Sequence, residues 1–543
     1  MLGPADPAAS RSYLLAPVSL VPNGRAHLGH VGGPLLKIDV LARHLRRRGD
    51  RVVVASTSDV YESHMLVKAY QEGRPVEQLC AENFARIAAD LAALDIVYDE
   101  YVNPLDPRWR ARYAEHNLQT MRDLVANGAT EAVRERIPFA AGSGRPVVGG
   151  WFVGRCPDCG AGAGSYFCEK CGAHFLPQEM LEPGARFAAD EPLEWREETC
   201  LFLRLRDVEG LFAHMARMGV RADFQDIART YLARRGPRIR LTAPGDWGIP
   251  WPVPGSTTPQ TIFTYSALLY AANLICGDIA AERLGLAVNA FDPAAEVTTV
   301  TCFGVDNAVP FLVGVLGSAL EQRRYKPFDH FLVNYFYDLE HSKFSTNRGH
   351  VIWAADIVDK TPASSDAVRF YLACVNPEFE TSNFDVAGFV AFTNWMAAEL
   401  APALAASQAA RPAQPPPPAP ALLARLEQLL AVQERALDPQ TFALAASAGA
   451  AKDWIAERGA LAREPGDHGW WLKGAALLFA PLMPRLAAAL WESCGHAGEP
   501  RLAVFLERRP SAAQPLPLPV AVPLEVEDLR PCFPATLADS ALV

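Results

Sequence analysis

LAPVSLVPNGRAHLGHV, residues 15–31, is the stretch that decides the fold of this chain. An apolar run leads into a Pro-Asn-Gly turn at residues 22–24, and a helical pattern follows over residues 35–45. This order predicts a buried strand, a loop and a helix. Gly29 stands close to the expected start of the helix, where the absence of a side chain lets a flat ligand lie against the backbone.

Two histidines, His27 and His30, stand three positions apart at the start of the predicted helix. This spacing places both imidazoles on one side of the first turn, whose free N–H groups favour an anion. There they could donate hydrogen bonds to a triphosphate whose negative charge grows as pyrophosphate departs. From the residues alone, two surface or capping histidines are the alternative.

The turn at residues 22–24, followed by His27-Leu28-Gly29-His30, resembles the first signature of the class I aminoacyl-tRNA synthetases, the methionyl type most closely. The resemblance implies an α/β fold with a Rossmann-type parallel sheet, a zinc-knuckle insertion and a following helical bundle of the anticodon-binding kind. It also implies that His27 and His30 bind ATP and stabilise the adenylation transition state. Asn23 and Gly29 would then lie beside the nucleotide.

The composition bounds the class of protein. The chain has 543 residues, of which 50% are hydrophobic, enough for several domains and a large core. No uncharged apolar run is long enough to predict a transmembrane helix, and residues 1–14 lack the layout of a signal peptide. The net charge of −10 gives no overall attraction to nucleic acid. Eleven cysteines, an odd number, suggest thiols and a metal in a reducing cytoplasm.

The resemblance covers nearly the whole chain and predicts an order of domains. The expected parts are the first half of the catalytic domain (1–125), the insertion with the knuckle (126–195), the second half of the catalytic domain (196–335), a signature-loop region (336–385), the helical bundle (386–508) and a proline-rich tail (509–543). Within the bundle, residues 411–420 (RPAQPPPPAP) predict a polyproline spacer rather than a helix. The tail is predicted to be an extended strap over the catalytic domain or a disordered end.

Four cysteines form two Cys-x-x-Cys pairs separated by eight residues: Cys156 with Cys159, and Cys168 with Cys171. Each pair can offer two thiolates to one ion from a tight turn, and four sulfurs complete a tetrahedral site with no open position. This spacing predicts structural Zn²⁺ rather than disulfides or idle thiols. The zinc would hold the insertion together and take no part in the chemistry.

Acidic residues follow two of the predicted strands. Asp59 comes just after the β-branched run 51–56, at the end of a strand where ligands of open parallel sheets bind. The family resemblance implies that Asp59 holds the amino group of the substrate, and a helix N-cap is the alternative. Gly304 and Asp306 resemble residues that line the adenosine site of the family, although Val305 replaces a lysine between them.

The side-chain pocket departs from the methionyl pattern. Where relatives present an aromatic lining to methionine, ungapped counting along this chain gives other residues: Val21, Thr264, Ala271, Asn307 and Phe311. Aromatic rings select a long thioether through sulfur–ring contacts, whereas small and polar groups leave room for a polar side chain. Methionine is therefore a doubtful substrate, unless the counting slips by a residue or two near Thr264.

A second signature stands at residues 341–350, HSKFSTNRGH. It resembles the Lys-Met/Phe-Ser-Lys-Ser loop of the class I family, which closes on the phosphates and neutralises the departing pyrophosphate. Lys343 matches the first lysine, and Phe344 and Ser345 follow as in the family. Thr346 replaces the second lysine, so Arg348 is the nearest cation that could compensate.

The surface that would read an anticodon looks eroded. Residues 404–410 (LAASQAA) stand where relatives carry asparagine and arginine, and an Ala-rich face offers neither bidentate hydrogen bonds nor rings for stacking. A cluster of arginines between residues 229 and 240 forms a local basic face, suited to RNA or phosphate but equally to a solvated surface. Binding of tRNA is therefore open.

These features predict a diverged paralogue that activates a free amino acid with ATP and Mg²⁺ and passes it to a small acceptor such as a hydroxylamine in specialised metabolism. A cupin-type partner enzyme would be a separate protein, and no contact with a membrane is expected. Two alternatives remain. One is a genuine methionine–tRNA ligase. The other is a non-catalytic paralogue that binds an amino acid or RNA, and the replacement of two lysines by Thr346 and Val305 supports it.

Overall fold

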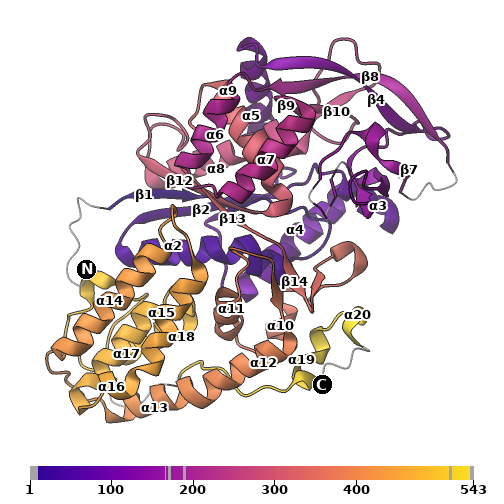
Figure 1. Cartoon of the computed structure of the whole chain (residues 1–543). Coiled ribbons are helices and arrows are strands. Elements are labelled where there is room, and N and C mark those ends of the chain that lie inside the picture. The colour runs from indigo at the N-terminus through magenta and orange to yellow at the C-terminus, as the bar shows by residue number, and fades with distance from the viewer. Residues whose placement is uncertain are drawn as a thin grey trace.

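A computed structural model describes residues 10–165, 167–168, 171, 173–186, 191–512 and 517–538. Five parallel strands lie in the strand-bearing lobe, which sits above a lobe of helices in Figure 1. Their order across the sheet is β13 (His330–Asn334), β12 (Val297–Gly304), β1 (Ser12–Leu15), β2 (Arg51–Thr57) and β3 (Glu100–Val102). Helix α2 (Leu36–Arg48) covers one face and α8 (Leu269–Leu284) the other, as the predicted α/β fold requires.

The strand order reverses at β1, which pairs with β2 on one side and with β12 on the other. Ligands of open parallel sheets bind outside the carboxyl ends of the strands at such a switch point. The residues that follow β1 lead to His27, and the residues that follow β12 lead to Asp306. The topology thus brings the two predicted nucleotide-binding segments to one edge of the sheet.

The first strand is shorter than the sequence predicts. β1 ends at Leu15 instead of continuing to the turn at 22–24, because Pro17 has no N–H to donate to a ladder. Beyond the turn, α1 (Leu28–His30) runs into the π-helix η2 (Val31–Leu35) and then into α2. The predicted helix over 35–45 is therefore confirmed, with a break before it at Gly33 and Pro34.

The insertion forms antiparallel sheets of its own. β4 (Thr130–Ala140) pairs along its whole length with β8 (Leu193–Arg204), and β9 (Arg238–Arg240) adds to the other edge of β8. From the sequence, the run at residues 195–205 (WREETCLFLRL) predicts a strand that returns toward the parallel sheet. These residues do form a strand, but it pairs with β4 and β9 in this separate sheet. Glu198 is buried there and accepts hydrogen bonds from Ser256, Thr257 and Thr258.

The helical lobe contains the predicted bundle. Its main helices are α12 (Val386–Trp395), α13 (Ala401–Ala410), α14 (Pro420–Ala436), α15 (Leu444–Ala456), α17 (Pro465–Phe479) and α18 (Pro484–Ser493). Trp454, Trp470 and Trp471 are fully buried among them, so they hold the core together and offer no ring to a base. Residues 411–419 are not helical, in agreement with the predicted spacer.

The tail returns toward the strand-bearing lobe. Its short helices α19 (Val526–Leu529) and α20 (Ala535–Ala538) pass α12 and approach the signature loop. There Thr536 Oγ1 lies 2.7 Å from His350 Nδ1. The described part of the tail thus fits the predicted strap, while residues 513–516 and 539–543 lie outside the described residues.

One helix in the described part of the chain, Val386–Ala410, is long and apolar enough to cross a membrane. That statement rests on length and composition, and 28% of the apolar window is buried. A single helix of this kind is weak support for a membrane span, because core helices pass the same test. Here α12 contacts α19, and α13 contacts α17.

Candidate active site

The two predicted catalytic histidines lie against each other. The ring of His27 stacks on that of His30, with 3.7 Å between centroids, and on that of Phe344, with 5.1 Å between centroids. The backbone N–H of His27 donates to His30 Nδ1 over 3.3 Å. Nδ1 of His27 is buried and has no hydrogen-bond partner. An imidazole held in this way has a nitrogen available for a ligand.

Burial decides the charge of both rings. It is the main cause that lowers the pKa of His27 well below its usual value, and the charges of His30 and Lys343 add to that effect. Burial also lowers the pKa of His30 to about 4. Both imidazoles are therefore neutral near pH 7, where each can donate one N–H to a phosphate oxygen.

The second signature packs directly on the first. Phe344 is buried under His27 and Tyr337, and it follows Lys343 in the short strand β15 (Ser342–Lys343). A Cβ atom at Gly24 would lie 2.7 Å from Cγ2 of Thr346, so the turn at 22–24 also touches this loop. The structure thus brings together two motifs that stand more than 300 residues apart in the sequence.

Gly29 makes this packing possible, so its replacement is a direct test. A Cβ atom at Gly29 would lie 2.8 Å from Phe344 and 3.0 Å from His27. We expect Gly29→Ala to push the signature loop off the histidines, at a cost of about 1–3 kcal/mol, and to slow adenylation accordingly. The matched control is Gly449→Ala in α15, where a Cβ meets no atom within 4 Å. Equal adenylation rates in the two variants would contradict this packing role.

Asp59 lies at the end of β2 with its side chain buried and its Oδ1 without a hydrogen-bond partner. Burial, followed by the charge of Glu62, raises the pKa of Asp59 well above its usual value. The capping alternative does not hold, because the next helix, α3 (His64–Glu72), has Ser63 at its N-cap. A buried, unpartnered carboxyl oxygen is suited to an ammonium group.

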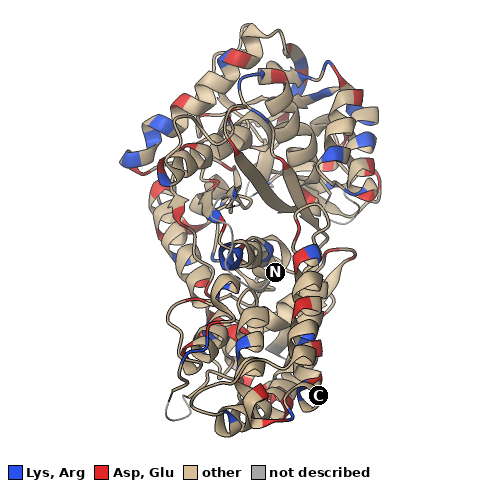
Figure 2. Cartoon of the chain, turned by 90° about the vertical axis from the view of Figure 1, so that its left-hand side faces the viewer, with Lys and Arg blue, Asp and Glu red and all other residues tan. Residues whose placement is uncertain are grey.

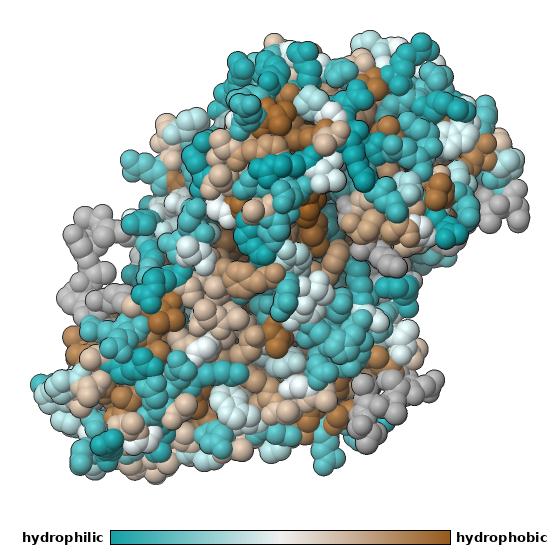
Figure 3. Space-filling view, in the orientation of Figure 1, coloured by the Kyte–Doolittle hydropathy of each residue, from teal (hydrophilic) through white to brown (hydrophobic). Residues whose placement is uncertain are grey.

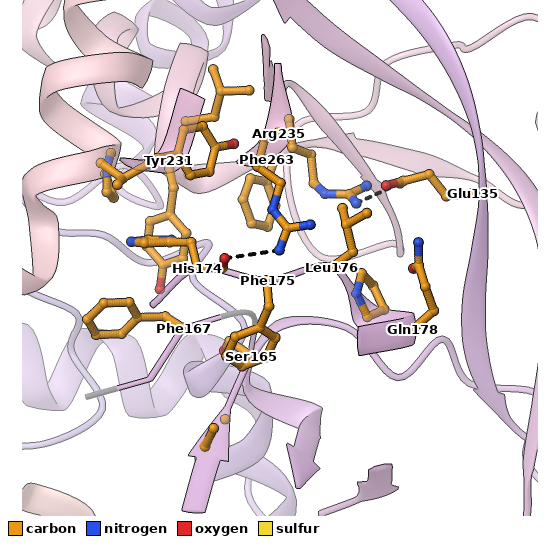
Figure 4. Close-up of a pocket in the computed structure, with 18 of the residues that line it drawn as sticks. Glu135, Ser165, Phe167, His174, Phe175, Leu176, Gln178, Tyr231, Arg235 and Phe263 are labelled. Atoms are coloured by element: carbon orange, nitrogen blue, oxygen red, sulfur yellow. Dashed lines mark hydrogen bonds and ion pairs between the residues drawn. The ribbon is translucent and has the colours of Figure 1, made fainter. Parts of the chain in front are cut away.

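A cavity of about 820 Å³ opens beside these motifs, and Figure 4 shows its far wall. Asp306, Asn307, Ser345 and Arg348 line one end of it. The side-chain amide of Asn307 donates to Asp306 Oδ1 over 3.3 Å, so Asn307 already has a polar partner within the chain. His27 and His30 line neither this cavity nor the smaller one described below; Phe344 stacks on His27, and His30 is half-buried.

The predicted side-chain pocket is not assembled as one site. Thr264 lines a second cavity of about 500 Å³, next to Trp247. Phe311 is buried in the core between Phe303 and Phe331 and lines neither cavity, contrary to its predicted contact with substrate. Val21 and Ala271 also line neither cavity. The residues predicted by counting along the family pattern therefore do not share one cavity.

The remaining predicted residues lie around the same edge of the sheet. Asn23 is half-buried in the turn, which Asn83 holds by donating to the carbonyl of Pro22 over 2.8 Å. Gly304 ends β12, and a Cβ there would lie 2.8 Å from Asp306 Oδ1. Arg348 donates to the carbonyl of Lys343 over 3.2 Å.

The four cysteines converge on one point, as predicted. Their Sγ atoms all lie within 4.8 Å of one another, with 3.7 Å between Cys156 and Cys171 and 3.6 Å between Cys159 and Cys168. Sulfurs about 2.3 Å from a tetrahedral Zn²⁺ would be spaced at nearly this distance. These Sγ–Sγ distances are too long for disulfides, so the disulfide alternative finds no support among the described residues. The donor set fits a structural zinc.

The arginines between residues 229 and 240 are paired individually instead of forming one open basic face: Arg229 pairs with Asp226 over 2.8 Å, and Arg238 pairs with Glu131 over 3.5 Å. Arg235 and Arg240 turn into the large cavity, where Arg240 pairs with Glu135 over 2.6 Å and Arg235 donates to the carbonyl of His174 over 3.0 Å (Figure 4). Arg234 pairs with Asp158 beside the cysteine cluster. Acidic and basic residues alternate over both lobes in Figure 2, and brown residues gather in the hollow of the strand-bearing lobe in Figure 3. These arginines brace the insertion against the catalytic domain.

Sequence reasoning missed a polar cluster next to Asp59. It consists of Glu62, His64 and Tyr265, of which Glu62 is buried, while His64 and Tyr265 line the large cavity. Glu62 accepts hydrogen bonds from both of the others. The sequence shows Glu62 three positions beyond Asp59, but it gives no signal that would join Tyr265 to it.

Comparison with known proteins places the chain in a family. A family model described as "tRNA synthetases class I (M)" matches residues 16–406, a range that includes both signatures and the cysteine cluster. The methionine–tRNA ligase of Bifidobacterium animalis subsp. lactis is 29% identical over 394 residues, which are 68% of this chain and 62% of that protein. The methionine–tRNA ligase of Cutibacterium acnes is 28% identical over 396 residues, which are 69% and 64%. The chain thus matches less than two thirds of the length of these relatives.

A solved structure shares the fold. Mycobacterium tuberculosis methionyl-tRNA synthetase in complex with methionyl-adenylate superposes with a TM-score of 0.71 at 19% identity. The match covers 93% of this chain and 99% of that one. At this identity the structural likeness supports the fold only. The family model matches more than half of the chain and therefore shows the family. The chain therefore belongs to the class I aminoacyl-tRNA synthetases, of the methionyl type.

Proposed function

We propose that the chain forms an aminoacyl-adenylate: the carboxylate of an amino acid attacks the α-phosphate of ATP, and the bond to pyrophosphate breaks. The observation that carries this proposal is the ring stack of His27, His30 and Phe344, because it joins both family signatures into one cluster. Such a reaction needs in-line positioning and stabilisation of growing negative charge, and no covalent enzyme intermediate.

The predicted catalytic and nucleotide-binding residues each have a part in this proposal. His27 and His30 donate N–H groups to the phosphates, while Lys343 and Arg348 neutralise the departing pyrophosphate. Asp59 holds the ammonium group of the substrate. The nucleotide is held by the residues predicted to bind ATP: Asn23, Gly29, Gly304, Asp306, Phe344 and Ser345. Mg²⁺ bound with ATP would neutralise part of the phosphate charge.

Phe344 stacks on the ring of His27 in the structure, so we infer that the signature loop lifts when ATP enters. The loop is short and begins at β15, and Ser345 pairs with His350 at its base through two backbone hydrogen bonds of 3.0 and 3.1 Å. Movement about this base would bring Lys343 and Arg348 onto the phosphates. A neutral His pair would then meet the phosphates from the side opposite these two cations.

The relatives favour methionine as the amino acid and tRNA as the acceptor, since the two relatives described above are methionine–tRNA ligases. We therefore propose methionine–tRNA ligase activity first, in a reducing cytoplasm, which suits a chain whose cysteines form no disulfide in the described residues. Transfer to a small acceptor, the main prediction from the sequence, has less support, and the comparisons offer none for a cupin-type partner.

The small-acceptor function stays a second candidate because of two observations. Thr264 and Asn307 put polar groups at the two cavities, and α13 carries alanines where base-reading residues would be needed. A chain of this kind would still form the adenylate but would not charge tRNA. The two candidates therefore share the first half-reaction and differ in the second.

Amino-acid-dependent exchange of pyrophosphate into ATP tests both halves. We expect exchange with methionine, and formation of methionyl-tRNA when initiator tRNA is added. Exchange with another amino acid, without charging of tRNA, would favour the second candidate. Absence of exchange with all twenty amino acids would contradict the proposed activity and favour the non-catalytic paralogue that Thr346 and Val305 suggested.

A further inference from the structure

Tyr265 is held in an unusual backbone position next to the large cavity. It lies inside the π-helix η5 (Thr264–Leu268), at φ −87° and ψ 23°, in the sparsely populated bridge region. Gly314 packs against it so closely that a Cβ atom there would lie 2.5 Å from the carbonyl oxygen of Tyr265. π-Helices and bridge-region residues are frequent at functional sites. The fold therefore fixes where this ring points.

The hydroxyl group of Tyr265 donates a hydrogen bond to a buried carboxylate. It is donated to Glu62 Oε1 over 3.1 Å, and Glu62 is 1% exposed. Ser63 donates to the same oxygen over 2.9 Å, and His64 Nδ1 lies 2.6 Å from Oε2. Burial raises the pKa of Glu62, but the charge and hydrogen bonds of His64 outweigh it and bring the pKa to about 2. Glu62 thus stays ionised, and the oxygen of Tyr265 is left as an acceptor.

The surroundings of this oxygen favour a cation. After burial, the charges of Glu62, Asp59 and Asp306 are the causes that raise the pKa of the Tyr265 hydroxyl. Asp59 is 5% exposed, and its Oδ1 has no hydrogen-bond partner. A buried carboxyl oxygen of this kind is costly unless a ligand pairs with it. Two acceptors in a negative environment match an ammonium group, which carries three donors.

We propose that Tyr265 is a second anchor for the α-ammonium group of the amino acid, next to Asp59, and that Glu62 is the positioning residue that turns the hydroxyl oxygen toward it. This inference rests on the proposed function, because it places the substrate of that reaction. It requires no particular side chain on the amino acid. It adds to the expected site a tyrosine and a glutamate that the family pattern did not point to.

The test compares two probes on the full chain by titration calorimetry. L-Methioninol keeps the ammonium group and lacks the carboxylate, whereas 4-(methylthio)butanoate keeps the carboxylate and lacks the ammonium group. We expect Tyr265→Phe to weaken binding of L-methioninol about tenfold, and to change binding of 4-(methylthio)butanoate by less than about twofold. Equal weakening of both probes, no weakening of either, or no binding of either probe to the wild type would overturn the proposal.

Two further variants separate positioning from general damage. Glu62→Gln keeps an oxygen that accepts from Tyr265, so we expect it to retain most of the affinity for L-methioninol, whereas Glu62→Leu should resemble Tyr265→Phe. Tyr270→Phe is the matched control, because Tyr270 is buried in α8 and its hydroxyl has no partner. In exchange assays, Tyr265→Phe should raise the KM for the amino acid with little change in kcat. If the wild type does not exchange pyrophosphate, the proposed function is contradicted. The binding of L-methioninol and 4-(methylthio)butanoate still tests the role of Tyr265 separately.

Discussion

Replacing His27 with asparagine is expected to slow adenylate formation by about a hundredfold to a thousandfold. His27 stacks between His30 and Phe344, and its buried Nδ1 has no partner within the chain. Because its pKa is lowered well below the usual value, mainly by burial, the ring would act as a neutral donor near pH 7. An asparagine amide is shorter and cannot reach the same phosphate oxygen.

The rate of pyrophosphate exchange at saturating ATP and amino acid measures this effect. The control is His214→Asn on α6 (Val208–Arg217), where the imidazole contacts Arg217 on the surface and touches neither signature. Both variants should unfold at temperatures within a few degrees of the wild type. Exchange by His27→Asn at the rate of His214→Asn would show that the histidine cluster has no part in the chemistry.

Substitution of Cys171 with serine is expected to release the metal and to loosen the insertion. The four Sγ atoms lie within 4.8 Å of one another, and Cys171, which is exposed like Cys159, faces Cys156 over 3.7 Å. A structural zinc in so small a unit supplies binding energy on the order of 10 kcal/mol. The small sheet around it would lose this energy: β5 (Phe152–Arg155), β6 (Gly162–Gly164) and β7 (Leu181–Ala185). We expect faster proteolytic cleavage within residues 150–186.

Elemental analysis of the purified protein gives the direct readout. The wild type should hold about one zinc per chain, and Cys171→Ser should hold much less. Cys374→Ser is the matched control, since this thiol is half-buried in α11 (Ser365–Cys374) and lies outside the cluster. A wild-type chain that contains no zinc, or a variant that keeps it, would refute the structural metal site.

The features that sequence reasoning predicted well are local. The two Cys-x-x-Cys pairs specify a ligand geometry within 16 residues, and the prolines of 411–420 exclude a helix by covalent structure alone. His27 and His30 stack because three positions along one turn bring them together. In each case the chemistry of neighbouring residues decides the result without help from the rest of the fold.

The features that it missed depend on contacts between distant segments. β8 reads as a strand, but only its pairing with β4 and β9 shows that it leaves the parallel sheet. Phe311 stands where a family pattern places a pocket residue, yet its ring packs against Phe303 and Phe331 in the core. The cluster around Glu62 joins residues about 200 positions apart, so no spacing in the sequence reveals it.

The most direct test of the central claim is a single turnover with ATP labelled at the α-phosphate and an excess of enzyme. We predict that amino-acid-dependent label appears in enzyme-bound aminoacyl-AMP, and that the double variant His27→Asn/His30→Asn forms it at least a thousandfold more slowly. Formation of the adenylate at the wild-type rate by the double variant would contradict the account, and so would a wild-type chain that forms none with any amino acid.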